Sequence, residues 1–460
     1  MSSKSVDVLI CGAGIAGIST AYHLAVERGI RDVLLVDERP PLSLTSDKST
    51  ECYRNWWPGP GDAMVSMMNR SIDILERLAD ESGNIFQLNR RGYLFATAEP
   101  ARLETFRAHG EEAATLGAGP LRIHDGKSGG PAYQPASLEG YHHQPIGADL
   151  ITDPALIREH FPYLSEATVG VIHARRAGWF SAQQLGMYML ERARAAGVRL
   201  RTGRVTGLDL RGDRIQGARI QDNGTEEVIA TRQVVNAAGP FVDELAGMAG
   251  LELPVFSELH TKLSIQDHLG LFPREAPLLI WADPQRLPWK PEETQLLAED
   301  PETHFLLETF PEGIHARAEG PLDSNVVLIL WTYHTDPVQP TFPIPQDPYN
   351  PEIALRGMAA LVPAFEAYFE RPPRPFVDGG YYTKTQENRP LVGPLPIEGF
   401  WIIGALSGFG LMAGPACGEL LSLHIAGEAL PSYSEWFLLS RYQDPQYRRL
   451  LETWDRTGQL

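Results

Sequence analysis

The sequence predicts an α/β protein, α+β overall, in which a domain of alternating strands and helices carries an inserted domain built on a mainly antiparallel sheet. Three observations predict this class. The N-terminus has a strand–glycine–helix unit, two later blocks alternate strand and helix, and the segments between them are sheet-like and rich in proline.

The N-terminal unit begins with an apolar run at 6–11, which has the length and composition of a buried parallel strand. Gly12, Gly14 and Gly17 follow in G-x-G-x-x-G spacing, and a helix starts at once. The first glycine permits a tight turn, the second lets the backbone approach a pyrophosphate, and the third lets helix and strand pack closely. Free N–H groups at the helix start attract phosphate. The predicted cofactor-binding residues of this unit are Gly12, Gly14, Ile15, Ala16 and Gly17.

A second apolar run at 33–36 ends in Asp37, which lies 20 residues after Gly17. Asp37, with Glu38 beside it, stands where an acid accepts hydrogen bonds from ribose hydroxyls. A lone glycine pattern also occurs in ordinary α/β loops. Strand, glycines, helix, second strand and acid in this order instead predict a Rossmann-like, dinucleotide-binding domain.

Composition excludes several classes of function. The net charge of −18 argues against a nucleic-acid partner or an anionic membrane surface. No apolar run has the length of a membrane span, and strand one begins too early for a signal peptide, so we expect a cytoplasmic protein. The three cysteines are far apart and form no C-x-x-C pair, which argues against disulfides and a metal site.

Parts of the first domain return later in the chain. Residues 185–202 predict a helix and a strand, 205–220 a hairpin, 233–238 a buried strand, and 400–403 a strand before a glycine-rich segment. The loop at 125–148 is either a substrate lid or a disordered insertion. The predicted division is 1–88, 153–253 and 376–434 for the cofactor domain, 89–152 and 254–375 for the substrate domain, and 435–460 for a helical tail.

The chain resembles the FAD-dependent amine and amino-acid oxidoreductases of the D-amino acid oxidase, glycine oxidase and sarcosine oxidase family. The blocks that carry the resemblance are the N-terminal fingerprint, STECYR at 49–54, VVNAAGPFVDELA at 234–246, YTKT at 382–385, and 404–418. The resemblance implies FAD rather than NAD. It also implies that a hydride leaves the α-carbon of a small amine or amino acid for flavin N5, and that the imine product is hydrolysed. Oxygen or another acceptor then takes the electrons.

The resemblance also assigns cofactor contacts. Ser49 and Thr50 are expected at the pyrophosphate, although an N-cap role is the alternative. Val205 is expected to contact the adenine through its backbone, and Gly239, after Ala238, allows close approach to the cofactor. A glycine-rich loop is expected to feed a helix that starts near Pro415 and points its N-terminus at the flavin. The contacts implied in this late loop are Gly408, Gly410, Leu411 and Met412.

The catalytic candidates are Arg54, His334 and Lys384. Arg54 best matches an arginine beside flavin and substrate, His334 lies in the family's Tyr-His-Thr, and Lys384 lies in YTKT. Several expected residues are replaced. Leu330 stands in place of an oxygen-activating lysine, Met412 in place of a carboxylate-binding lysine, and Gly380 in place of the cysteine that holds flavin covalently.

These replacements predict non-covalent FAD and slow reaction with oxygen, with Lys262 and Lys384 as substitute cations. Trp56 and Trp57 suggest an aromatic pocket wall, with core packing as the alternative. Two other functions stay open: a flavin-containing assembly factor or binding protein without turnover, and an NAD-dependent dehydrogenase. The late glycine loop argues against the dehydrogenase, because a simple nicotinamide fold does not require it.

Overall fold

A computed structural model describes residues 5–57, 59–127 and 130–454. The first region is built on a six-stranded sheet in the order β21-β22-β13-β1-β2-β9. All neighbours are parallel except β21 and β22. The strands are β1 (Val8–Cys11), β2 (Val33–Asp37), β9 (Arg199–Thr202), β13 (Val234–Asn236), β21 (Leu391–Pro394) and β22 (Phe400–Gly404).

Both faces of this sheet are covered, as the apolar composition of its strands requires. Helices α1 (Ile15–Tyr22), α5 (Ala182–Ala195) and α9 (Gly410–Ala426) pack together over one face, and α2 (Ala63–Ser82) packs against α9. The other face meets α6 (Val242–Gly247) and a three-stranded sheet. That sheet consists of β10 (Arg204–Leu210), β11 (Ile215–Asp222) and β12 (Thr225–Ala230).

The second region is a nine-stranded sheet in the order β20-β14-β19-β18-β15-β4-β7-β6-β5. It is mainly antiparallel; only the pairs β15–β4 and β5–β6 are parallel among the described strands. Its strands are β4 (Tyr93–Thr97), β5 (Leu121–His124), β6 (Ala148–Ile151), β7 (Gly170–Ala174), β14 (Phe256–Gln266), β15 (Leu278–Trp281), β18 (His315–Glu319), β19 (Val326–Leu330) and β20 (Pro375–Lys384). The predicted fold class is confirmed.

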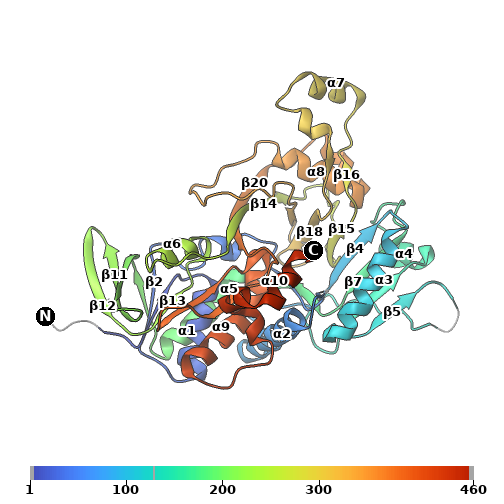
Figure 1. Cartoon of the computed structure of the whole chain (residues 1–460). Coiled ribbons are helices and arrows are strands. Elements are labelled where there is room, and N and C mark those ends of the chain that lie inside the picture. Colours follow the sequence, from blue (N-terminus) through green and yellow to red (C-terminus); the bar gives the residue numbers. More distant parts are fainter. Residues whose placement is uncertain (1–4, 58, 128–129, 455–460) are drawn as a thin grey trace.

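The remaining elements are short. Helices α3 (Arg102–Ala113), α4 (Pro154–His160) and α8 (Asn350–Leu361) pack against the large sheet, and α7 (Pro291–Glu299) projects from it (Figure 1). Two further ribbons join β3 (Cys52–Arg54) to β8 (Ala177–Trp179) and β16 (Gln285–Arg286) to β17 (Thr309–Phe310). Helix α10 (Pro445–Glu452) lies in the predicted tail, whose residues 455–460 are outside the described range.

Sheet membership does not follow the predicted division at two places. β7 pairs with β4 and β6, and β20 pairs with β14, so both strands belong to the nine-stranded sheet, although the predicted cofactor domain includes them. Local sequence could not show this, because a buried strand looks the same whichever sheet supplies its hydrogen-bond partners. The assignment of the two regions to separate domains stays a prediction.

The late glycine segment also differs from expectation. α9 begins at Gly410, so Pro415 lies inside the helix rather than at its start. A Cβ at Gly414 would lie 3.0 Å from Ile15 Cγ1, and one at Gly418 would lie 2.2 Å from Ser19 Oγ. These two glycines therefore let α9 pack closely on α1.

Two remaining features bear on the predictions. The predicted loop 125–148 ends where β6 begins, at Ala148, and its described residues before that form no helix or strand. The loop is nevertheless anchored: Tyr141 is buried, and the Tyr133 hydroxyl lies 2.9 Å from His173 Nδ1. In the described chain one helical stretch, Ser407–Ala426, has the length and composition of a membrane span. Of its most apolar window, 67% is buried inside the protein.

Candidate cofactor and substrate site

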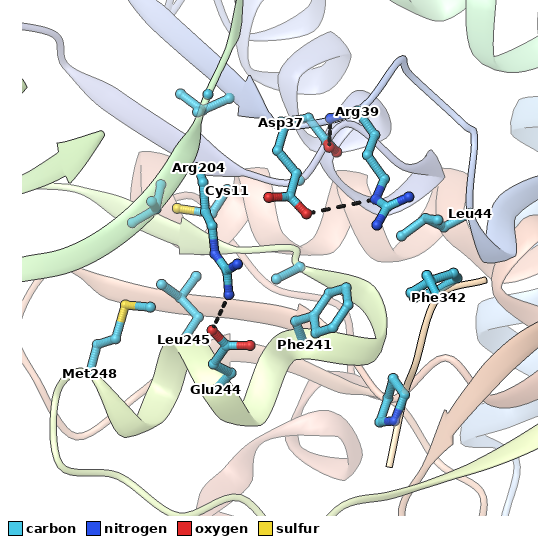
Figure 2. Close-up of a pocket in the computed structure, with 17 residues that line it drawn as sticks. Cys11, Asp37, Arg39, Leu44, Arg204, Phe241, Glu244, Leu245, Met248 and Phe342 are labelled. Carbon is cyan, nitrogen blue, oxygen red and sulfur yellow. Dashed lines mark hydrogen bonds and ion pairs between the residues drawn. The ribbon is translucent and has the colours of Figure 1, made fainter. Parts of the chain in front are cut away.

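Three cavities follow one another from the six-stranded sheet towards the nine-stranded sheet. The first cavity lies at the carboxyl ends of β1 and β2 (Figure 2). A Cβ at Gly12, whose φ is +111°, would lie 2.2 Å from the Ala237 carbonyl oxygen, so only glycine fits this turn. The lining residues are Cys11, Gly12, Val36, Asp37, Glu38, Arg39, Leu44, Gly203, Arg204, Val205, Ala238, Phe241, Glu244, Leu245, Met248, Pro340 and Phe342.

Asp37 holds the glycine turn and faces this cavity at the same time. Its Oδ2 accepts from the Ala13 N–H at 2.7 Å, and its Oδ1 accepts from the Arg39 N–H at 2.9 Å. Burial raises the pKa of Asp37, against the effect of these two hydrogen bonds. A carboxylate so placed has acceptor capacity left for hydroxyl donors such as those of a ribose.

The second cavity lies at the N-termini of α1 and α9. Ser46 Oγ accepts from the Ile15 N–H at 3.0 Å, so this hydroxyl stands at the start of α1. Sequence analysis missed Ser46, although the hydroxyl-rich run at 45–50 was the available signal. Gly17 does not line the cavity; a Cβ there would lie 1.9 Å from the Gly12 carbonyl oxygen, which agrees with its predicted packing role.

The second cavity is formed mainly by backbone turns and by the N-terminal ends of two helices. Ala405 and Ser407 both have positive φ, and the Ser407 hydroxyl lies 2.8 Å from Asn388 Oδ1, which holds the loop before α9. Both helix N-termini direct backbone N–H groups and the positive end of a helix dipole towards an anion. The predicted cofactor residues that line this cavity are Gly14, Ile15, Ala16, Ser49, Gly239, Gly408, Gly410 and Leu411.

The third cavity shares Ser49, Tyr382 and Gly408 with the second, so the two adjoin. Its walls come from both regions of the molecule and are largely aromatic or apolar. The lining residues are Ser49, Thr50, Cys52, Arg54, Trp57, Tyr93, His260, Leu278, His315, Leu330, Thr332, Tyr382, Gly408, Phe409 and Met412.

Arg54 is the one arginine or lysine among the described residues that line the third cavity. Only 3% of it is exposed, and its guanidinium carbon lies 4.5 Å from the Trp57 ring centroid and 5.6 Å from that of Tyr93. Burial lowers the pKa of Arg54, yet a guanidinium titrates so high that it stays charged. The cavity therefore presents a fixed positive charge between aromatic rings.

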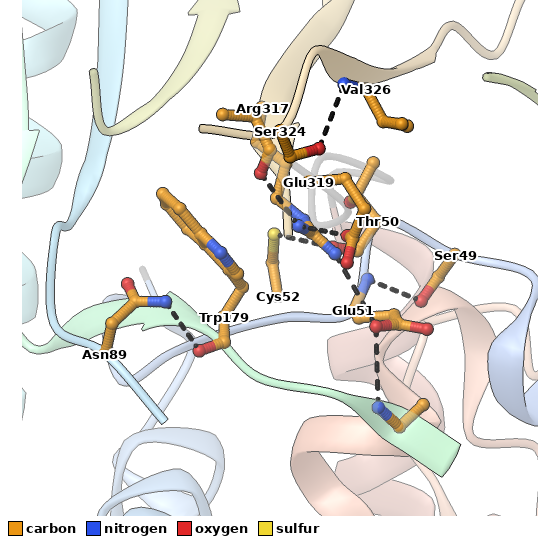
Figure 3. A network of polar contacts seen from close by, with 12 residues as sticks. Ser49, Thr50, Glu51, Cys52, Asn89, Trp179, Arg317, Glu319, Ser324 and Val326 are labelled. Carbon is orange, nitrogen blue, oxygen red and sulfur yellow. Dashed lines mark hydrogen bonds and ion pairs between the residues drawn. The ribbon is translucent and has the colours of Figure 1, made fainter. Parts of the chain in front are cut away.

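A buried network holds the chain segment that leads to Arg54 (Figure 3). Arg317 on β18 donates through Nε to the Thr50 carbonyl oxygen, and its other nitrogens lie 2.5 Å from Glu319 Oε2 and 3.5 Å from Glu51 Oε2. The Thr50 hydroxyl lies 3.4 Å from His315 Nε2, so this side chain faces the third cavity and not the second. Thr50 does not line the second cavity, and its predicted pyrophosphate contact stays a prediction.

Two imidazoles that sequence analysis did not single out line the third cavity. His315 Nδ1 lies 2.9 Å from the Gly313 carbonyl oxygen, which can only accept, so Nδ1 carries the proton. Burial lowers the pKa of His315 to about 4. His260 stacks on Tyr382 with ring centroids 4.1 Å apart and contacts Glu258 and Thr332. Both imidazoles are therefore neutral at physiological pH.

Two of the three predicted catalytic residues do not line the cavity. His334 has 63% of its side chain exposed and lies 3.6 Å from Asp347, because β19 ends at Leu330 and the chain then turns to the surface. Lys384 donates to Glu258, behind His260. Lys262 donates to the Asp47 carbonyl oxygen at 2.9 Å and does not line the cavity either.

Residues 7–423 match the family described as FAD dependent oxidoreductase (DAO). This chain belongs to that family of FAD-dependent oxidoreductases. The family decides between the two predicted cofactors in favour of FAD. The residues present fit FAD, because the three cavities form a path from Asp37 past two helix N-termini to Arg54. A side chain at Gly12 or Gly14 would narrow this path; a Cβ at Gly14, for example, would lie 3.1 Å from Ser46 Oγ.

Two curated proteins are similar to part of this chain. The chain is 25% identical to the mitochondrial dimethylglycine dehydrogenase of Homo sapiens over 283 residues, which are 59% of this chain but only 28% of that protein. It is 23% identical to sarcosine oxidase subunit beta of Arthrobacter sp over 294 residues, covering 59% of this chain and 64% of that subunit. The chain thus spans less than a third of the dehydrogenase it matches.

Solved structures show the same fold over almost the whole chain. L-proline dehydrogenase from P. horikoshii superposes with a TM-score of 0.72 at 20% identity, covering 96% of this chain and 98% of that one. Glycine oxidase from Geobacillus kaustophilus gives a TM-score of 0.70 at 17% identity, covering 95% and 99%. The predicted resemblance is therefore confirmed.

Proposed function

We propose that this flavoprotein oxidises the C–N bond of a small amino acid or related amine. The observation that carries the proposal is the third cavity, where the buried guanidinium of Arg54 stands among aromatic rings next to the glycine loop before α9. A guanidinium in a dry pocket suits a carboxylate, because charge-assisted hydrogen bonds are strong where water is excluded. The names of the relatives point to the same substrate class.

The chain's own residues account for binding and orientation. Arg54 holds the substrate carboxylate, and Trp57, Tyr93 and Tyr382 shape the cavity and exclude water. Gly14, Ser46 and the α1 N-terminus suit the pyrophosphate, and Asp37 suits the ribose. Bound FAD supplies the hydride acceptor for the α-carbon, after which water converts the imine to a carbonyl compound and an amine. Attachment is non-covalent at position 380, because Gly380 has no side chain to form a bond.

Anaerobic mixing tests the proposal. Purified protein should contain one FAD per chain, and its visible absorption should bleach with at least one of glycine, N-methylglycine, N,N-dimethylglycine and L-proline. FAD content without bleaching by any of these or by a wider amine panel would favour the second candidate, a flavin-containing assembly factor or binding protein without turnover. Bleaching that yields no carbonyl product would contradict C–N oxidation.

The electron acceptor is a separate part of the proposal. Leu330 lines the third cavity, and both substitute lysines are engaged elsewhere: Lys262 with a carbonyl oxygen and Lys384 with Glu258. A cation beside the flavin would stabilise superoxide as it forms, and leucine cannot. We therefore expect slow reoxidation of photoreduced protein in air-saturated buffer by stopped flow, and an acceptor other than oxygen. Fast reoxidation would instead indicate an oxidase. A cytoplasmic location stays a prediction.

A further inference from the structure

A chain of polar contacts leads away from the third cavity behind Tyr382. Thr332 Oγ1 lies 2.8 Å from His260 Nδ1, and His260 Nε2 lies 3.0 Å from Glu258 Oε2. Lys384 donates to the same carboxylate oxygen. Thr332 and His260 line the cavity, whereas Glu258 and Lys384 are buried behind them.

The positions of the protons follow from these contacts. Burial alone would raise the pKa of Glu258, but the hydrogen bonds from His260 and Lys384 lower it, so the carboxylate is ionised and can only accept. His260 therefore carries its proton on Nε2. Since the ring is neutral, Nδ1 is an acceptor, and the Thr332 hydroxyl must donate to it. The lone pairs of Thr332 Oγ1 are left for a donor in the cavity.

We propose that Thr332, His260 and Glu258 form a proton relay that deprotonates an ammonium substrate before its oxidation. This inference rests on the proposed function, because an ammonium group cannot release hydride from the neighbouring carbon until its nitrogen regains a lone pair. The substrate N–H bond breaks and its proton goes to Thr332 Oγ1. The hydroxyl proton of Thr332 moves to His260 Nδ1, and the new imidazolium donates through Nε2 to Glu258. Only a proton moves in this step; no electrons leave the substrate.

Lys384 is a positioning residue in this relay. The titratable or charged groups facing His260 are Glu258 on β14, Lys384 and Tyr382 on β20, and His315 on β18. Tyr382 and His315 are neutral, because burial raises the pKa of the phenol and lowers that of the imidazole. Burial first and then the Lys384 charge lower the pKa of His260, while Glu258 raises it. Lys384 thus keeps His260 unprotonated and ready to accept.

The pH dependence of flavin bleaching tests the relay. With a working relay the bleaching rate constant rises through an ionisation of the enzyme and levels off well below the pKa of the free substrate amine. Thr332→Val removes the hydroxyl with little change in shape, and His260→Gln removes the base. In both, bleaching should fall about a hundredfold at pH 7 and should then follow the fraction of neutral amine, rising tenfold per pH unit up to the amine pKa.

Thr332→Ser is the matched control, since it keeps the hydroxyl and should keep the wild-type profile. Thr294→Val, on the exposed helix α7, controls for a generic effect of losing a threonine hydroxyl. Lys384→Met should move the enzyme ionisation to higher pH, because the cation that disfavours imidazolium is gone. N-methylglycine, N,N-dimethylglycine, glycine and L-proline are the probes.

Histidine-¹⁵N NMR of the substrate-free holoprotein gives a second readout that does not depend on turnover. The signal lost in His260→Gln should show the proton on Nε2 and should shift in Thr332→Val. A proton on Nδ1 would overturn the relay. Wild-type bleaching profiles in both Thr332→Val and His260→Gln would overturn it too and leave the proposed function intact. If no probe bleaches wild type, the proposed function and the relay fail together.

Discussion

The first and third cavities lie in one cleft but are built on different principles. The first is shaped by backbone: a glycine turn, two strand ends and a carboxylate that accepts from main-chain N–H groups. The third is shaped by side chains from β3, β4, β14, β15, β18 and α9, which meet only when two sheets are assembled. The turn that positions Asp37 is thus local in the sequence, whereas the third cavity depends on the assembly of the whole fold.

The ion pairs near the first and third cavities also differ in how far they are exposed to water. At the mouth of the first cavity Arg204 pairs with Glu244 at 2.7 Å, with 55% and 47% of their side chains exposed. Behind the third cavity Lys384 pairs with Glu258, each 7% exposed. Water screens the first pair, so it contributes little, whereas loss of one partner of the second leaves a buried charge without compensation. Strong substitution effects are therefore expected at the third cavity.

The largest effect should nevertheless come from the backbone of the first cavity. Gly12→Ala places a Cβ about 2.2 Å from the Ala237 carbonyl oxygen at a φ of +111°. We expect purified protein without flavin absorbance. Gly224→Ala is the control, because its φ is +77° but nothing lies within 4 Å. It should cost about 1–3 kcal/mol of stability and keep its FAD. Equal FAD loss in both would show that backbone strain and not contact with Ala237 decides binding.

Arg54→Met should show that the third cavity recognises a carboxylate. A charge-assisted hydrogen bond contributes about 1.5–3 kcal/mol, so the Kd of an amino-acid substrate should rise about ten- to a hundredfold. The measurement is the concentration dependence of anaerobic bleaching. An amine of similar size without a carboxylate serves as the control and should bind equally to both proteins. A matching loss of affinity for that amine would assign Arg54 to packing against Trp57.

His315→Gln tests, through the pH dependence of stability, whether His315 is buried at the third cavity. The folded pKa of about 4 lies below the ordinary 6.5, so both states are neutral above pH 6.5. As the pH falls, the unfolded chain takes up a proton that the folded site excludes. This site should therefore lose about 2 kcal/mol of stability between pH 7 and pH 5. Denaturant unfolding of holoprotein should show that loss reduced in His315→Gln and unchanged in His304→Gln, which alters an exposed histidine. An equal loss in all three proteins would refute the assignment.

The smallest effect is expected at His334, which sequence analysis placed in the catalytic set. Because its imidazole is exposed and near Asp347, His334→Gln should change the bleaching rate constant less than about twofold. Stopped-flow bleaching at pH 7 checks this. A tenfold loss would mean that the segment after Leu330 closes over the cavity during turnover.

Which residues could be predicted depends on how local their signal is. Gly12, Gly14 and Asp37 were predictable because one strand–turn–helix unit contains their whole geometry. His260 and His315 were not, because a strand pattern shows that alternate residues share a face but not which face meets the cavity. That choice is made by register: His260 lies opposite Gly380, and His315 lies opposite Leu330.

Short motifs carry the prediction for the two catalytic candidates that do not line the third cavity. His334 was chosen because Tyr-His-Thr follows an apolar strand, but the strand ends four residues earlier than the histidine. Lys384 was chosen from YTKT and does lie near the cavity, but its ammonium group points to Glu258. Arg54 lines the third cavity because β3 is held on both sides, by β8 and by the Arg317 network; its catalytic role stays a prediction.

The scattered origin of the cleft has a consequence for biosynthesis. The first cavity needs Asp37 and Ala238, but the second also needs the turn from Gly404 to Leu411. A ribosome that adds about 5–20 residues per second needs roughly 20–75 s to travel from Asp37 to Leu411. The nascent chain therefore has no complete FAD-binding site until translation is nearly finished. Cells short of riboflavin should consequently accumulate full-length apoprotein rather than truncated chains arrested at the cofactor.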